Sequence, residues 1–147
     1  MSREEDAKRF RHFLEAQAPV YTAVLEELRR GRKESHWMWF VFPQLAGLGR
    51  SAMSRRYRLD SLGEAALYAA HPVLGHRLRE CTGLVAGHAG MSAREIFGPP
   101  DDTKFRSSMT LFEAAVPEEP LFAAAIEQFF GGGRDGLTLQ LLRNAAR

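Results

Sequence analysis

Several features that would identify a secreted, disulfide-linked or membrane protein are missing from these 147 residues. The single cysteine, Cys81, excludes an internal disulfide and any zinc cluster that needs several cysteines. No apolar run approaches the roughly 18 residues of a membrane span, and the opening MSREEDAKRF is too charged for a signal peptide. We therefore expect a soluble cytoplasmic protein that does not associate with a membrane.

Motifs of known chemistry are also scarce. The five histidines form no HExxH or similar ligand spacing, and the GxSxG signature of a serine nucleophile is absent. We expect no metal site and no cofactor. Whether the protein is an enzyme remains open from the sequence.

The sequence contains no pair of alternating apolar segments that could form a sheet, and a lone strand would leave its backbone groups unpaired. Helix signals are frequent instead: Ser92 with Glu95 has the spacing of a capping box, and Ser35 and Ser51 are suitable N-caps. These patterns predict an all-α fold, a single domain over residues 1–147 with about seven to nine short and medium helices.

Charge is unevenly distributed along the chain. Residues 29–58 carry eight arginines and lysines against one acid, a net charge of +7, and residues 95–135 carry a net charge of −5. A local basic field attracts anions even when the total charge is only +2. The basic segment could equally dock on the acidic one, and the sequence leaves both interpretations open.

The stretch SHWMWFVFPQ, residues 35–44, contains six consecutive apolar residues, Trp37 to Phe42, and four of them are aromatic. A helix that is apolar on every side is buried on every side, so the core is its default location. Phe42 precedes a proline, which predicts that the helix ends before it. Trp37 and Trp39 cannot point the same way in a helix, and we expect at least one of them at the edge of a groove.

Two polar segments flank or follow this stretch. RRGRKES, residues 29–35, places four cations near a helix end, where they complement the helix dipole or contact phosphate. DDTKFRSSMTLF, residues 101–112, sets Phe105, Met109 and Phe112 on one helical face. Its hydroxyl residues are mediocre helix formers, which suggests that they bond another helix, a buried water or a ligand.

These residues carry a resemblance to a known family. The segments Gly31–Ser51 and Ile96–Phe112 resemble the two strongest motifs of the bacterial domain of unknown function 1810, and residues 16–21, 71–80 and 129–142 also match its pattern. The resemblance implies a small, mostly helical, single-domain bacterial protein, and it implies no activity. Some members are labelled calpastatin, but that inhibitor is disordered, unlike a chain with this many aromatic residues of the buried type.

Three functions follow as hypotheses: a cleft that binds or converts a small anionic molecule of the nucleotide or sugar-phosphate kind, a nucleic-acid-binding module that uses residues 29–58, and a non-catalytic protein-interaction domain. The first requires that the two motif segments face one cavity. Its candidate catalytic residues are His36, Asp102, Ser107 and Ser108. Its candidate ligand-binding residues are Arg32, Lys33, Trp37, Trp39, Gln44, Ser51, Asp101, Lys104 and Arg106.

Overall fold

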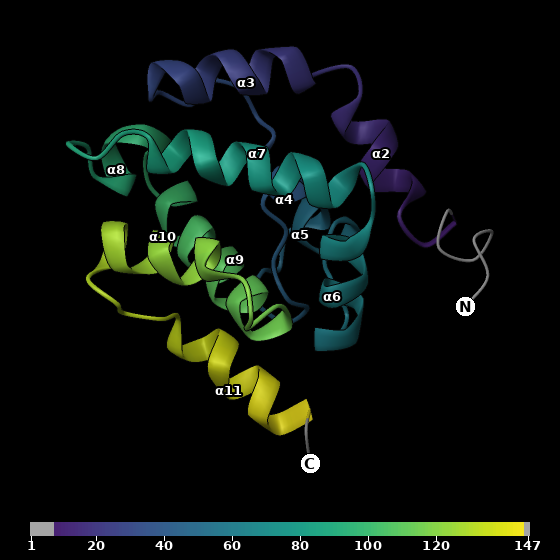
Figure 1. Ribbon diagram of the computed structural model, residues 1–147. Coiled ribbons are helices and arrows are strands. Elements are labelled where there is room, and N and C mark those ends of the chain that lie inside the picture. The colour runs from purple at the N-terminus through teal and green to yellow at the C-terminus, as the bar shows by residue number, and fades with distance from the viewer. Residues whose placement is uncertain (1–7, 146–147) are drawn as a thin grey trace.

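The computed structural model describes residues 8–145 and is built almost entirely of helices (Figure 1). The helices in this range are α2 (Arg11–Gln17), α3 (Tyr21–Arg30), α4 (Met38–Val41), α5 (Ala52–Arg56), α6 (Leu62–Ala70), α7 (Leu74–Ala86), α8 (Ala93–Phe97), α9 (Asp101–Ala115), α10 (Pro120–Phe130) and α11 (Gly136–Ala145). The all-α prediction is confirmed. The expectation that the chain has no signal peptide rests mainly on residues 1–7, which lie outside the described range.

The expected count of seven to nine helices is wrong, because ten helices lie within residues 8–145. The excess comes from short segments: α4, α5 and α8 have only four or five residues each, yet each forms its own hydrogen-bonded turn. Strand-like pairing in the described part of the chain is limited to one isolated parallel bridge between Leu45 and Leu59. None of the described helices is long and apolar enough to cross a bilayer.

Local capping signals determine several helix boundaries. The predicted capping box is confirmed at Ser92 and Glu95, and Ser51 caps α5 by accepting the N–H of Ser54. The prediction that Ser35 caps the aromatic helix is wrong. Its hydroxyl donates to the Glu27 carboxylate instead, so α4 begins two residues later, after Trp37.

Helix α9 lies in the middle of the fold and packs against α6, α8, α10 and α11 (Figure 1). Phe105, Met109 and Phe112 are fully buried along it, which confirms the predicted core stripe. The aromatic segment 37–42 supplies the facing side of this core, because Phe42 packs edge-on against Phe105 with 5.1 Å between the ring centroids. The two motif segments are therefore neighbours in space.

Candidate functional site

Besides the packing of Phe42 against Phe97 and Phe105, the segments 31–51 and 96–112 are joined by contacts of Lys33 and Lys104. The backbone N–H of Lys33 donates to the Ile96 carbonyl at 2.7 Å, and Lys33 Nζ lies 2.9 Å from Asp101 Oδ2. One turn further along α9, the ammonium of Lys104 lies over the Trp39 ring, 4.8 Å from its centroid. These contacts hold α4 and the loop that precedes it against Ile96 and the first two turns of α9.

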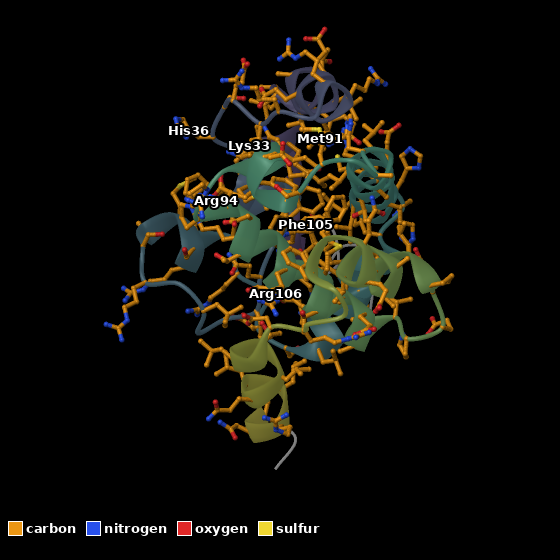
Figure 2. The ribbon with its side chains drawn as sticks, turned by 90° about the vertical axis from the view of Figure 1, so that its left-hand side faces the viewer. Lys33, His36, Met91, Arg94, Phe105 and Arg106 are labelled. Carbon is orange, nitrogen blue, oxygen red and sulfur yellow. The ribbon has the colours of Figure 1, made fainter. Side chains whose placement is uncertain are left out.

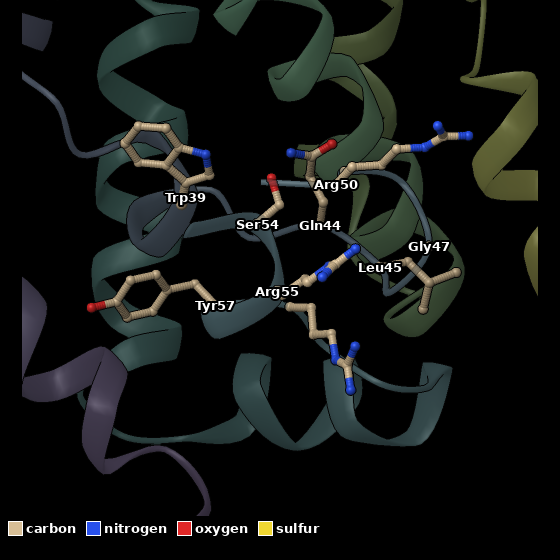
Figure 3. Close-up of a pocket in the computed structure, with 10 residues that line it drawn as sticks. Trp39, Gln44, Leu45, Gly47, Arg50, Ser54, Arg55 and Tyr57 are labelled. Carbon is tan, nitrogen blue, oxygen red and sulfur yellow. The ribbon is translucent and has the colours of Figure 1, made fainter. Parts of the chain in front are cut away.

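Two adjoining hollows lie where the segments meet. The first, which we call the Trp39 hollow, has a volume of about 260 Å³ and is lined by Trp39, Leu45, Arg50, Arg55, Tyr57 and Arg58, among others (Figure 3). The second, the Lys104 hollow, has a volume of about 250 Å³ and is lined by Leu48, Thr103, Lys104, Ser107, Asp135 and Leu137. Gln44, Gly49 and Ser54 line both hollows. The two hollows therefore adjoin each other; residues 44–58 line both, and α9 lines the Lys104 hollow, and we call the pair the groove.

The groove has an excess of cations. Arg50 and Arg55 are exposed, and within residues 8–145 neither guanidinium group takes part in a hydrogen bond or an ion pair. Arg58 pairs with Asp60 at 3.0 Å, but 50% of the Arg58 side chain and 63% of the Asp60 side chain are exposed, so solvent screens this pair. Docking of the basic segment on the acidic one thus accounts for Lys33 but leaves Arg50 and Arg55 free to attract an anion.

Trp39, which lines the Trp39 hollow, carries an unsatisfied hydrogen-bond donor. Its Nε1 is buried, and no acceptor among the described residues receives its hydrogen. The close-up shows the indole nitrogen on the side of the ring that faces Ser54 and Gln44 (Figure 3). An unpaired buried N–H costs roughly 1–3 kcal/mol, which an acceptor on a bound molecule would offset.

Trp37, by contrast, lies in the core with only 1% of its surface exposed. Its Nε1–H donates to Glu27 Oε1 at 3.0 Å, and the same carboxylate accepts the backbone N–H groups of Glu34 and Ser35 and the Ser35 hydroxyl. Burial raises the pKa of Glu27, but these four hydrogen bonds outweigh it and lower the pKa to about 2. As expected, one tryptophan lines a groove, and the other is part of the core.

Other residues predicted to bind a ligand have partners within the protein. Lys33 is 93% buried along its side chain and bonds Asp101 and the Ser35 carbonyl. Asp101 also pairs with Lys104 at 3.3 Å, one turn further along α9. Ser51 caps α5. Arg106 donates from Nε to the Gly133 carbonyl at 2.6 Å, so it positions the glycine-rich loop that precedes α11.

Arg32 and the candidate acid–base residues lie outside the groove. Arg32 is exposed. His36 is exposed too and projects from the surface, away from the core around Phe105 (Figure 2). Asp102 accepts the N–H of Thr103 in the first turn of α9. The prediction that these residues act on or bind a ligand thus receives no support from their position.

Three hydroxyl residues of α9 have different surroundings: one bonds the start of α11, one lines the groove and one is fully buried. Thr110 donates to the Arg106 carbonyl and accepts the N–H of Asp135, which attaches the start of α11 to α9. Ser107 lines the Lys104 hollow and donates to the Thr103 carbonyl at 3.1 Å. Ser108 is fully buried, and its hydroxyl has no hydrogen-bond partner in the described structure. Of the two serines, only Ser107 thus lines the groove, and within residues 8–145 no side-chain base forms a hydrogen bond with its hydroxyl.

The structure adds groove residues that the sequence did not single out, namely Arg50, Ser54, Arg55, Arg58 and Asp135. The net charge of residues 29–58 indicated the arginines as a group but did not separate those near the groove from the others. No sequence signal indicated Asp135, because it follows a glycine run and reads as a loop residue. Within the described residues no three His, Cys, Asp or Glu side chains gather closely enough to hold a metal ion.

Comparisons with known proteins extend the resemblance over nearly the whole chain. A family model described as a protein of unknown function (DUF1810) matches residues 7–142. Among solved structures, the chain is similar to the crystal structure of the conserved hypothetical protein Rv1873 from Mycobacterium tuberculosis, with 55% sequence identity and a TM-score of 0.90. The match covers 91% of this chain and 96% of the other. A search of curated proteins found no match.

Proposed function

The chain belongs to the DUF1810 family of proteins of unknown function, and we propose that it binds a small anionic molecule, of the nucleotide or sugar-phosphate kind, in the groove between residues 44–58 and α9. The observation that supports the proposal is the unpartnered, buried N–H of Trp39, a residue that lines the same hollow as Arg50 and Arg55. All three side chains can only donate hydrogen bonds, so an acceptor-rich anion complements them.

The size of the groove supports a small-molecule ligand. Each hollow, at about 260 and 250 Å³, lies just below the range of roughly 300–1,000 Å³ that is usual for ligand sites. Joined through Gln44, Gly49 and Ser54, the two hollows together fall within that range. Both motif segments face this groove, which is the condition that the ligand-cleft hypothesis set.

Binding can be tested by isothermal titration calorimetry at low salt with inorganic phosphate, ribose 5-phosphate and adenosine 5′-monophosphate. The double variant Arg50→Ala/Arg55→Ala removes two groove cations, and Arg29→Ala/Arg94→Ala removes two exposed cations that do not line the groove. We expect the groove variant to bind at least about tenfold more weakly, since each lost charge-assisted hydrogen bond contributes roughly 1.5–3 kcal/mol. The control should bind as the wild type does.

Two results would contradict the proposal: the absence of binding by all three probes, or an equal loss of affinity in both double variants. The second would indicate a diffuse electrostatic field rather than a site. The nucleic-acid alternative is distinguished by a single-stranded oligonucleotide in the same titration. Because counterion release makes such binding steeply salt-dependent, an oligonucleotide that binds far more tightly than the mononucleotide would favour that alternative.

A further inference from the structure

The groove differs in chemistry between its two ends, and we infer that its ligand is a phosphate ester of a hydroxylated carbon chain, with the phosphate in the Trp39 hollow and the hydroxyls in the Lys104 hollow. This inference rests on the proposed function. It adds which ligand class fits and in which orientation.

The Trp39 hollow is rich in donors. The indole of Trp39 and the guanidinium groups of Arg50, Arg55 and Arg58 have no acceptor atom. A phosphate offers only acceptor oxygens at neutral pH and matches the planar donor geometry of arginine. A neutral hydroxyl would use its acceptor capacity there but leave its own hydrogen without a partner among these side chains.

The Lys104 hollow has the opposite feature, a carboxylate. Asp135 lines it, and Asp135 Oδ2 accepts the backbone N–H of Thr138 at 2.9 Å and the Thr138 hydroxyl at 2.6 Å. These bonds, with the bond from the Asp135 N–H to Thr110, fix the carboxylate at the start of α11. Since a carboxylate has about four lone-pair sites, it can still accept from a ligand donor. It also repels a second anionic group.

Hydroxyl groups suit this end because they donate to Asp135 while they accept from Lys104, which also lines the hollow. Ser107 contributes a further acceptor, because its hydrogen is directed to the Thr103 carbonyl. Between the two ends, Gln44 and Ser54 can both donate and accept, which suits the ester oxygen and the first hydroxyl of a sugar. A single inorganic phosphate would fill only one hollow.

Calorimetry on the full chain with four probes tests this assignment: ribose 5-phosphate, methyl phosphate, pyrophosphate and adenosine 5′-monophosphate. Methyl phosphate is the matched probe because it has the ester but no hydroxyl. The wild type should bind ribose 5-phosphate at least about tenfold more tightly than methyl phosphate, because one hydrogen bond to a charged group is worth about that ratio. Pyrophosphate, with an anion at each end, should gain nothing over methyl phosphate.

The variant Asp135→Asn keeps an oxygen to accept from Thr138 but removes the negative charge. It should lose most of the preference for ribose 5-phosphate and retain the affinity for methyl phosphate, whereas Glu118→Gln, an exposed acid away from the groove, should change neither. A merely structural role of Asp135 would weaken both probes equally and would overturn the inference. Equal affinity of the wild type for ribose 5-phosphate and methyl phosphate would overturn it too, while leaving the proposed anion site intact.

Failure of every probe to bind the wild type would refute the proposed function and this inference together. A free sugar phosphate and a nucleotide both carry a phosphate ester of a sugar, and adenosine 5′-monophosphate distinguishes between them. A free sugar phosphate is the better fit if ribose 5-phosphate binds more tightly, and a nucleotide is the better fit if the added base increases the affinity.

Discussion

Lys33 Nζ lies 2.9 Å from Asp101 Oδ2, and this ion pair joins the loop that leads to Trp39 to the first turn of α9. Only 7% of the Lys33 side chain is exposed, and its ammonium also lies over the Trp37 ring. A charge this deeply buried needs its partner, since an uncompensated one is costly. The pair therefore holds the loop before α4 against the start of α9.

Replacing Lys33 with Met keeps the length of the side chain and removes its charge. We expect the free energy of unfolding to fall by about 2 kcal/mol, less than for a fully buried pair because Asp101 keeps Lys104 as a partner. Urea unfolding of Lys33→Met, Asp101→Asn and the double variant measures the coupling. The double variant should lose less than the sum of the single losses, and strict additivity would contradict a direct interaction.

The Glu27 carboxylate predicts a pH dependence of stability. Its pKa falls from an ordinary value of 4.5 to about 2 on folding, so its contribution is present above pH 4.5 and is lost as the pH falls towards 2. The shift corresponds to roughly 3 kcal/mol. Denaturant unfolding should show the wild type more stable than Glu27→Gln at pH 7, with the difference shrinking below pH 4.5. A difference that stays constant from pH 7 to 2.5 would exclude this role.

The two tryptophans should respond differently to the same substitution. Trp37→Phe removes a donor from the Glu27 carboxylate and should lower the free energy of unfolding by about 2 kcal/mol. Trp39→Phe removes a donor that has no partner within residues 8–145, so the change should stay below about 1 kcal/mol. Thermal or urea unfolding of both variants makes the comparison, and equal losses would contradict the distinction between a core residue and a groove residue.

Much of the helical framework could be predicted because its signals are local. Helix ends follow from neighbouring residues: Gly31 ends α3 with a left-handed φ of 73°, and Pro43 follows α4 directly after its C-cap. The wrong prediction for Ser35 also comes from the use of local signals alone. A capping interpretation considers only the next three residues, whereas the partner of Ser35 is Glu27, eight residues earlier on another helix.

The site could be predicted only in part, because its residues are brought together by tertiary packing. Both motif segments were recognised, yet Lys33 and Arg106 have the same residue types as ligand-binding cations and instead bond Asp101 and the Gly133 carbonyl. Charge alone cannot separate a buried ion pair from a free arginine. Asp135 lines the groove because hydrogen bonds to Thr110 and Thr138 hold it there. Thr110 precedes Asp135 by 25 residues, so this contact could not be predicted from neighbouring residues.

Two glycines of α7 offer a test of the packing between α6 and α7. A Cβ on Gly75 would lie 2.1 Å from the Ala69 carbonyl oxygen, whereas one on Gly83 meets no atom within 4 Å. Gly75→Ala should therefore destabilise the protein by about 2 kcal/mol or more, since the backbone of the neighbouring turn must move. Gly83→Ala should stabilise it by roughly 0.5–1 kcal/mol through helix propensity. A neutral Gly75→Ala would show that the two helices are packed less closely than described.

The indole N–H of Trp39 reports on the groove most directly. The chain has only two tryptophans, so a ¹H–¹⁵N spectrum has two indole signals, and Trp37→Phe assigns them. On titration with ribose 5-phosphate, the Trp39 signal should move downfield in a saturable manner as its hydrogen finds an acceptor. The Trp37 signal should stay in place, because Glu27 already accepts its hydrogen. A Trp39 signal that does not move at saturating ribose 5-phosphate would contradict an anion site in this groove.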